Sequence, residues 1–279
     1  MRILNINEKP LFQIPAVTVA AGGTSIDEKP IPILSGIVDQ LPDELEALLI
    51  TADLQAYDFL YKPAYARRLL GFLVAEEMAA MAECELIPDA QRIGVILAGD
   101  FYAVPELNKR GGLGNVELIW RYFAHYFRWV VGVAGNHDQF NGQCQFGTVF
   151  RHQPNIYPLH GEVINLDHLS IAGISGILGQ PEKAWRHSLK EWTQMSQKVL
   201  AKAPNILVLH EGPDIPNTRL GGNRKIRQTL STVKTQLLVI CGHTYWKQPL
   251  VSFSDNIQVL NLDSRVVLLT QKGVQQLDE

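Results

Sequence analysis

The sequence predicts an α/β fold with helices on both sides of its sheet structure, and three observations support this class. From about residue 47 onward, short apolar runs of strand length alternate with segments of helical periodicity. Several of the apolar runs are continuous and stop at a polar residue, which is typical of buried parallel strands. The chain has 279 residues, of which 46% are hydrophobic, so a sizeable core can form in one large domain or two small ones.

Residues 1–46 differ from the rest because they are rich in proline and glycine. Two apolar runs flank a turn in this segment, and Pro30 and Pro32 place the second run towards the edge of a sheet. We therefore expect residues 1–46 to form a β-hairpin-like extension packed on the main domain. No linker with a shift in composition interrupts residues 47–279, so they are predicted to be that single main domain.

Within the main domain the predicted elements follow one another in α/β order. A strand ends at Asp53, and a helix runs from near Pro63, a favourable residue for a first turn, to about Cys84. Apolar side chains from Trp185 to Val199 recur every three or four residues, which indicates an amphipathic helix. The other predicted elements are strands at residues 92–100, 129–133, 161–168, 169–175, 205–210, 236–243, 249–253, 256–262 and 265–270, and a helix at 225–233.

Composition excludes several classes of protein. The counts of 25 Lys+Arg and 28 Asp+Glu give a net charge of −3, which makes no general case for binding nucleic acid. The three cysteines contain no CxxC pair, so neither a disulfide framework nor a thiolate zinc site is predicted. The sequence has no signal-peptide pattern and no apolar run of membrane-spanning length, so we expect a cytoplasmic protein with no membrane partner. The oligomeric state is left open.

Polar side chains stand just past the ends of five apolar strands. The carboxyl ends of strands in an open α/β sheet border the crevice in which ligands bind, so these clusters are expected to meet in one place. Carboxylate, amide oxygen and imidazole are ligands for divalent ions such as Mn, Fe, Zn or Mg. The clusters are Asp53 and Gln55; Gly99 and Asp100; Gly135, Asn136, His137 and Asp138; His210; and Gly242, His243 and Tyr245.

The order of these clusters resembles the motif pattern of the calcineurin-like metallophosphoesterase superfamily. That pattern runs Asp-x-His, Gly-Asp, Gly-Asn-His-Asp/Glu, His and Gly-His-x-His, and the match spans residues 53 to 245. The resemblance implies a four-layer αββα sandwich of two mixed β-sheets flanked by helices. It also implies that metal-activated water hydrolyses a small phosphorylated substrate, either a phosphodiester or a phosphomonoester, with the diester preferred.

The same resemblance implies a role for each matching residue of the metal site. Asp100 would bridge two ions, and Asp53 would bind the first of them. Asn136, His210 and His243 would complete the second ion position. Read alone, His210 fits a buried core histidine and the two aspartates fit helix N-caps, but their order along the chain favours metal binding.

His137 is the catalytic residue that the resemblance implies. It would contact the phosphoryl group and protonate the leaving oxygen. Asp138 or another nearby carboxylate would orient its ring and keep it protonated near neutral pH.

Substrate binding is assigned to a second set of residues. Asn136 would contact the substrate as well as the metal. The arginines in polar loops, Arg151, Arg219 and Arg224, would clamp phosphate oxygens, although a solvated charged loop explains them slightly better. The glycine-rich residues 111–114 lack the Gly-Lys-Ser/Thr of a P-loop and are interpreted as a flexible loop.

The sequence departs from the superfamily's pattern at two positions of the first ion site. Gln55 stands where the pattern has the histidine of Asp-x-His, and Tyr245 stands where it has the last histidine of Gly-His-x-His. A neutral amide is a poorer ligand than imidazole, and a phenolate requires a strongly lowered pKa. These two side chains either bind metal or only fill space. We expect one or two ions per chain, with Mn²⁺ favoured; without the first ion, the chain is a one-metal enzyme or a protein-interaction module.

Overall fold

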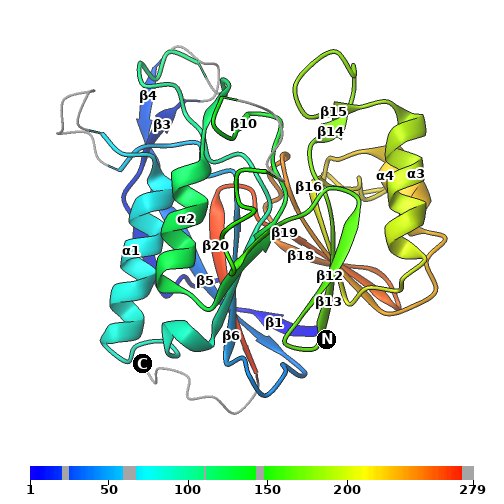
Figure 1. Ribbon diagram of the computed structural model, residues 1–279, viewed down its shortest axis with the longest axis horizontal. Coiled ribbons are helices and arrows are strands. Elements are labelled where there is room, and N and C mark those ends of the chain that lie inside the picture. The colour runs from blue at the N-terminus through cyan, green and yellow to red at the C-terminus, as the bar shows by residue number, and fades with distance from the viewer. Residues whose placement is uncertain (21–24, 59–66, 110, 143–147, 272–279) are drawn as a thin grey trace.

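Two β-sheets pack face to face and helices cover the outer face of each, so the fold is a four-layer sandwich (Figure 1). The predicted αββα architecture is confirmed. The computed structural model describes residues 1–20, 25–58, 67–109, 111–142 and 148–271. Among these residues, no helix is both long enough and apolar enough to cross a membrane.

The first sheet is mixed and has eight strands. Its spatial order is β1 (Ile3–Ile6), β5 (Ile31–Val38), β20 (Arg265–Gln271), β6 (Ala47–Ala52), β7 (Ile93–Leu97), β9 (Trp129–Gly132) and β11 (Ile156–Pro158), with β2 (Phe12–Ile14) also paired to β5. The strands β6, β7, β9 and β11 are parallel, whereas β20 runs antiparallel to β6. Because β6 and β7 are buried along their whole length, their sequences are continuously apolar rather than alternating.

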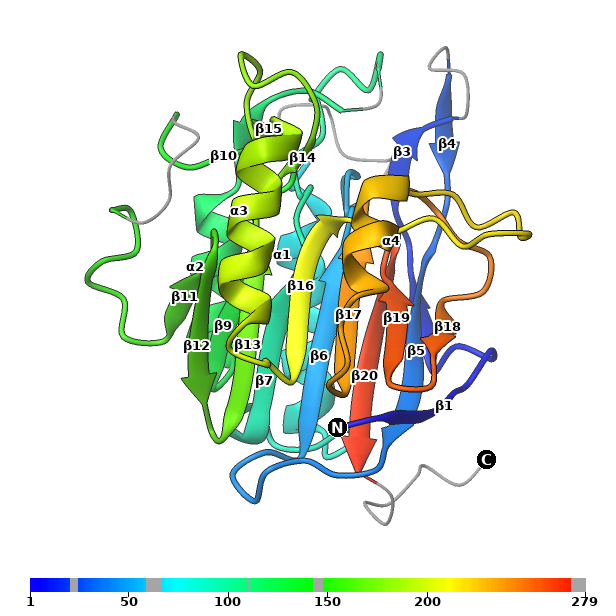
Figure 2. The same ribbon diagram turned by 90° about the vertical axis from the view of Figure 1, so that its right-hand side faces the viewer.

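The second sheet has six strands and is also mixed (Figure 2). Its order is β12 (Glu162–Leu166), β13 (Leu169–Ile174), β16 (Ile206–Glu211), β17 (Leu237–Gly242), β19 (Ile257–Asn261) and β18 (Leu250–Ser254). The four inner strands are parallel, and β12 and β18 close the edges as antiparallel partners. The predicted hairpin at residues 161–175 is the β12–β13 pair.

Helices α1 (Leu70–Glu83) and α2 (Glu117–Tyr126) cover the first sheet, and α3 (Leu189–Leu200) and α4 (Arg224–Leu230) cover the second. Three buried apolar clusters follow from this layering. One lies between α1, α2 and the first sheet, one lies between the two sheets, and one lies between the second sheet and α3 and α4. The short elements are a 3₁₀ turn at Ala90–Arg92 and the strand pairs β3 (Val17–Val19) with β4 (Ile26–Glu28), β8 (Gly114–Asn115) with β10 (Asp138–Gln139), and β14 (Ile177–Leu178) with β15 (Arg186–His187).

Three helix predictions need correction. The first helix begins at Leu70, and the start predicted near Pro63 lies outside the described residues. The helix predicted from Trp185 begins later because Ser188 caps it: the Ser188 hydroxyl accepts from the backbone N–H of Glu191, whose side chain accepts from the backbone of Ser188. α2 is absent from the predicted elements.

The two predicted runs of the N-terminal segment form β2 and β3 on one side and β5 on the other, and β2 pairs with β5 antiparallel, whereas β4 forms inside the predicted turn and pairs with β3. β5 is bonded to β20 on one side and to β1 and β2 on the other, so the prediction that it lies at a sheet edge is wrong. Its prolines are tolerated because the pairing with β20 starts only at Ile33, after Pro32. The division of the chain at residue 46 stays a prediction of the sequence.

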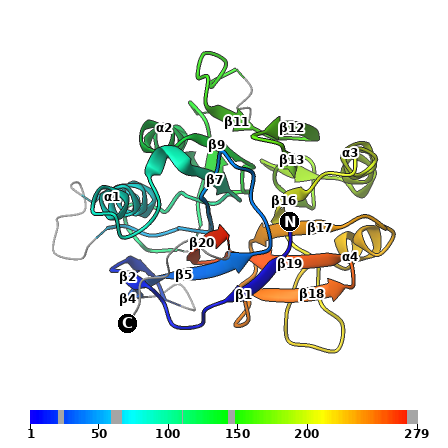
Figure 3. The same cartoon turned by 90° about the horizontal axis from the view of Figure 1, so that it is seen from below.

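The two sheets are also joined at their edge by the N-terminal strand (Figure 3). The side chain of Gln258, in β19 of the second sheet, accepts from the backbone N–H of Ile3 and donates to its carbonyl. This pair of hydrogen bonds ties β1 of the first sheet to the second. Residues near the start of the chain therefore help to hold the sandwich together.

Candidate metal centre

The polar strand ends meet at one end of the sandwich, as the sequence predicts. Asp53 follows β6, Asp100 follows β7, and Asn136 and His137 follow β9, all in the first sheet. His210 lies in β16 and His243 directly follows β17, both in the second sheet.

The backbone is unusual at three of these strand ends. Asp53, Asp100 and His243 have φ values of 54°, 61° and 67°, which lie in the left-handed region. Residues other than glycine rarely adopt this conformation, and such strain is often found at functional sites. The sharp reversal turns each side chain back towards the space between the two sheets' ends.

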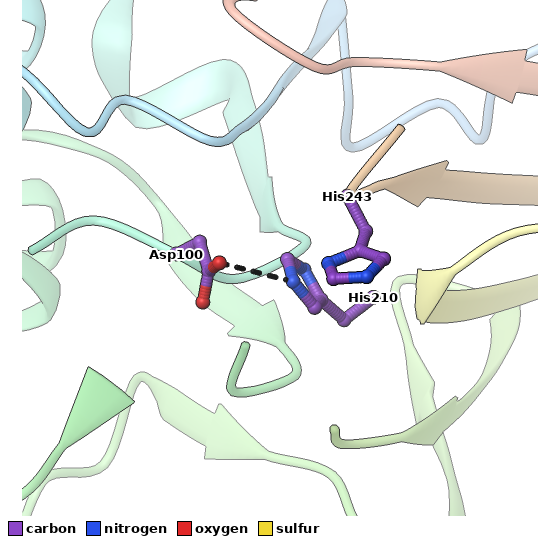
Figure 4. A group of neighbouring side chains, drawn as sticks. All are labelled: Asp100, His210 and His243. Carbon is purple, nitrogen blue, oxygen red and sulfur yellow. Dashed lines mark ion pairs between the residues drawn. The ribbon is translucent and has the colours of Figure 1, made fainter. Parts of the chain in front are cut away.

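Asp100, His210 and His243 form the centre of the site (Figure 4). Their ligand atoms all lie within 4.8 Å of one another. Nε2 of His210 lies 3.2 Å from Oδ2 of Asp100, and both residues are almost completely buried. A carboxylate and two imidazoles at this spacing are suitable ligands for a divalent transition-metal ion.

One buried atom at the site, Oδ1 of Asn136, has no hydrogen-bond partner among the described residues. Nδ1 of His210 donates to the carbonyl of Ala98 at 2.8 Å, and its buried Nε2 is directed at Oδ2 of Asp100, 3.2 Å away. Without a metal, Nε2 carries a proton that faces this carboxylate; with a metal, the Nε2 lone pair is free to bind the ion. Because an unsatisfied buried polar atom is costly, Oδ1 of Asn136 fits a site that a cation completes.

The charges around the cluster also favour a cation. Burial lowers the pKa of His210, but the carboxylates of Asp100 and Asp53 outweigh it and raise that pKa to about 10. Burial raises the pKa of Asp100, but His210 and His137 outweigh it and lower that pKa below its usual value. Burial and the charge on His210 lower the pKa of His243 to about 4, so its imidazole is neutral. The cluster therefore holds one positive charge, either as a proton on His210 or as a metal ion.

Metal binding should release a proton. A histidine ligand must be neutral, and His210 with a pKa of about 10 carries a proton at pH 7.5 when no metal is bound. We expect each Mn²⁺ ion to displace about one proton and its affinity to rise up to about tenfold per pH unit between pH 7 and 9. Calorimetric titration in two buffers of different ionisation enthalpy measures the released proton. Equal heats in both buffers would contradict this account.

The first ion position of the superfamily's pattern is altered in the structure as well as in the sequence. The side-chain N–H of Gln55 donates to Oδ2 of Asp100 at 3.0 Å, so the amide nitrogen, and not its oxygen, faces the carboxylate. Oδ2 of Asp53 accepts from the backbone N–H of His243 at 2.8 Å. Burial and the nearby Asp263 raise the pKa of Asp53 well above its usual value. Gln55 thus acts as a hydrogen-bond donor in place of a ligand.

Tyr245 has an exposed side chain, and its ring lies against two cations, which favours the second of the two predicted alternatives, that it fills space. Lys29 Nζ lies 5.1 Å from the ring centroid, and the guanidinium carbon of Arg265 lies 4.8 Å from it. The sequence could not show whether Tyr245 points to the cluster or to these two cations, because the Gly-His turn before it is the same in either case.

His137 borders the cluster, and its ring is oriented by the backbone. Nδ1 accepts from the backbone N–H of Gly112 at 3.1 Å, which leaves the ring proton on Nε2. That Nε2 lies 3.9 Å from Oδ2 of Asp100, and the side chain remains 30% exposed. The backbone N–H of His137 also donates to Oδ1 of Asp100 at 2.9 Å. The ring is therefore accessible to a substrate and close to the buried centre.

The prediction that Asp138 orients the His137 ring is not supported by its contacts. Its carboxylate accepts from the backbone N–H groups of Asp100, Phe101 and Gly135 at 2.8 to 2.9 Å. Burial raises the pKa of Asp138 to about 6. Asp138 begins β10, and its carboxylate is taken up by these three backbone N–H groups and not by the His137 ring. Asp138 therefore joins the turn after β7 to the turn after β9 by hydrogen bonds.

The glycines at residues 111–114 were interpreted as a flexible loop, but they pack against the site. Gly111 has a φ of 78°, and a Cβ on it would lie 2.5 Å from Cε1 of His137. Gly114 pairs with Asp138 across β8 and β10. The run of glycines in the sequence could have indicated this packing, because glycine permits the backbone to approach a side chain closely.

The three predicted substrate arginines lie apart from one another. Arg151 lines a cavity of about 880 Å³ together with Arg186 and other residues. Arg219 lines a separate cavity of about 740 Å³, and Arg224, at the start of α4, lines neither. Sequence reasoning missed Arg186, although burial, His210 and the charge of Arg186 all lower the pKa of His243.

Comparison with known proteins finds remote similarity only. No family model matches the chain, and no curated protein matches it. Similar solved structures include the sulfate thiohydrolase SoxB of Thermus thermophilus in complex with glycerol, with 11% identity and a TM-score of 0.44 over 82% of this chain and 53% of that chain. The chain therefore spans about half the length of the SoxB chain.

Two further solved structures are similar at the same level. The calcineurin-like phosphoesterase YfkN of Bacillus subtilis has 12% identity and a TM-score of 0.43 over 77% of this chain and 80% of that chain. The phosphopantetheinyl hydrolase PptH of Mycobacterium tuberculosis has 13% identity and a TM-score of 0.46 over 78% of this chain and 89% of that chain. Similarity this remote does not assign an activity to the chain.

Proposed function

We propose that this chain is a metal-dependent hydrolase of phosphoesters that works with one divalent ion. The observation that carries the proposal is the buried cluster of Asp100, His210 and His243, together with the buried, unpartnered Oδ1 of Asn136. These residues provide one carboxylate, one amide oxygen and two imidazoles. These hard and borderline donors suit Mn²⁺, Fe²⁺ or Zn²⁺, and we favour Mn²⁺.

We propose one ion because Gln55 and Tyr245 do not serve as ligands in this arrangement. Gln55 donates to Asp100, and Tyr245 lies against Lys29 and Arg265. Asp53, which would bind the first ion, instead holds the backbone N–H of His243. Gln55 and Asp53 thus orient Asp100 and His243, two ligands of the remaining ion. A small phosphorylated substrate and a cytoplasmic location stay part of the proposal.

The residues of the chain divide the work of hydrolysis between them. A bound divalent ion would supply Lewis-acid chemistry and activate water. His137 accepts a hydrogen bond at Nδ1, so its Nε2–H, next to Asp100, would donate a hydrogen bond to an oxygen of the phosphoryl group, and the proton for the leaving oxygen would come from solvent. Gln55 and the backbone of His137 donate to the two oxygens of Asp100 and fix its orientation. Asp138 keeps the turns in place.

Hydrolysis of bis-p-nitrophenyl phosphate and p-nitrophenyl phosphate with added Mn²⁺ tests the proposal. We expect Mn²⁺-stimulated turnover of at least one ester by the native chain and a loss of at least about 100-fold in Asp100→Asn, because the variant lacks the charge that binds the ion. Asp255→Asn, which changes an exposed aspartate outside the site, should retain full activity. Circular dichroism confirms that each variant is folded.

A second candidate function is favoured by the altered first ion position. If the native chain shows no turnover above that of Asp100→Asn with Mn²⁺, Mg²⁺, Fe²⁺ or Zn²⁺, the hydrolase proposal is wrong. The fold would then serve as a protein-interaction module, and Gln55 and Tyr245 would be substitutions that accompany the loss of catalytic activity.

A further inference from the structure

A cavity of about 740 Å³ is lined by residues that include four cations and Tyr245. The cations are Lys29, Arg219, Lys247 and Arg265, and they come from four separate segments of the chain. The only carboxylate among its described lining residues is that of Glu8. We call this cavity the cationic hollow.

Arg265 is the most informative residue of the cationic hollow because its guanidinium is buried. Only 4% of the residue is exposed, yet no carboxylate oxygen of the described residues forms an ion pair with it within 4.0 Å. It donates to the carbonyl oxygens of Trp246 at 2.5 Å and Asp263 at 3.3 Å. Burial lowers the pKa of Arg265 and outweighs Tyr245 and the nearby carboxylate of Asp263, which both raise that pKa.

Tyr245 links the cationic hollow to the metal centre. Its ring lies between the side chains of Lys29 and Arg265 in sequence-distant segments, with both cations within 5.1 Å of its centroid. Tyr245 stands two residues after His243, so one short turn carries both a metal-site residue and a wall of the hollow. Cation–π contacts hold this ring in place, and they do not neutralise the two charges.

We infer that the cationic hollow binds a phosphate-type anion. Guanidinium groups bind phosphate oxygens through two parallel hydrogen bonds, and lysines add compact positive charges. A cavity of this volume accommodates a small-molecule group larger than a single ion. The anion is either a second phosphate of the substrate, which rests on the proposed function, or a free phosphate or polyphosphate.

The first arm of the test measures anion binding without metal. Pyrophosphate is titrated into the full chain in EDTA and low salt, and binding is followed by calorimetry. We expect saturable binding that weakens at least about tenfold in Lys247→Glu, whose side chain is exposed and should not affect folding. Lys198→Glu makes the same charge change on the exposed face of α3 and should alter the affinity less than about twofold.

The second arm identifies the source of the anion. Hydrolysis of adenosine 3′,5′-bisphosphate is compared with that of AMP in the presence of Mn²⁺. A kcat/KM at least about tenfold higher for the bisphosphate, lost in Lys247→Glu, assigns the hollow to a second phosphate of the substrate. Pyrophosphate binding without such a preference supports the hollow as a site for a free phosphate or polyphosphate.

The inference is overturned if pyrophosphate does not bind in EDTA, or if Lys247→Glu and Lys198→Glu bind it equally well. Because this arm uses no metal and measures no turnover, its result is independent of the hydrolase proposal. Conversely, pyrophosphate binding without hydrolysis of any ester would support the cationic hollow as an anion site and contradict the proposed hydrolase activity.

Discussion

Replacing His210 by alanine should weaken Mn²⁺ binding at least about 100-fold, because loss of a residue that only orients a ligand already costs roughly 10- to 100-fold. His210 is fully buried, and its Nδ1–H is bound to the Ala98 carbonyl, so the Nε2 lone pair is fixed next to Asp100. No other described side chain is placed in the cluster to replace this nitrogen. Calorimetric titration with Mn²⁺ at pH 7.5 measures the affinity.

His168→Ala is the matched control for this substitution. The His168 side chain is 84% exposed and lies 3.7 Å from the carboxylate of Glu44, so its loss should leave Mn²⁺ affinity unchanged. His210→Gln, which retains more of the side-chain volume, separates loss of the ligand from loss of packing. If His210→Ala and His210→Gln both fold and bind Mn²⁺ as tightly as the native chain, the cluster is not the metal site.

Gly135→Ala should abolish metal-dependent turnover and destabilise the fold. A Cβ at this position would overlap Oδ1 of Asp100 and approach its backbone nitrogen to 2.5 Å. The turn after β9 and the turn after β7 would have to move apart, which would break the hydrogen bonds of Asp138 that bridge them. We expect the free energy of unfolding to fall by about 1–3 kcal/mol, as for other overpacked sites.

Urea denaturation of the variant measures the loss of stability, hydrolysis of the p-nitrophenyl esters with added Mn²⁺ measures the loss of turnover, and Mn²⁺ titration shows whether the ion still binds. Gly142→Ala is the control, because a Cβ there meets nothing within 4 Å. Gly142 has a φ of 74°, so this control carries the backbone strain of alanine in the left-handed region without a steric clash. A Gly135→Ala variant with native stability and native Mn²⁺ affinity would show that the two turns are not held in close contact.

Much of the candidate site could be predicted from the sequence because of where it lies on the strands. Asp53, Asp100 and Asn136 each follow a continuous apolar run, and parallel strands bring such ends to the same edge. His210 and His243 lie at the corresponding ends of two parallel strands in the second sheet. The burial of β6 and β7 made their apolar runs easy to recognise, whereas α2 was missed.

Side-chain directions could not be predicted in the same way. Asp138 and His137 are neighbours in sequence, but the Asp138 carboxylate accepts from the backbone N–H groups of the turns, whereas the His137 ring lies next to Asp100. Tyr245 follows the Gly-His turn as a ligand would, yet Lys29 and Arg265 draw its ring to the cationic hollow. These outcomes depend on contacts with residues far away in the chain.

The sequence by itself determined the alternation of strands and helices, the polar residues at the strand ends, and the donor types at the centre, because apolar periodicity and the order of polar residues are local properties. The four layers were implied only by the resemblance of the motif order to a known superfamily. Only the tertiary structure decided that Gly111 and Gly112 hold His137, that Gln55 donates to Asp100, and that Arg265 is buried without a carboxylate. Such pairings form between distant segments once the sheets have packed, so no local pattern encodes them.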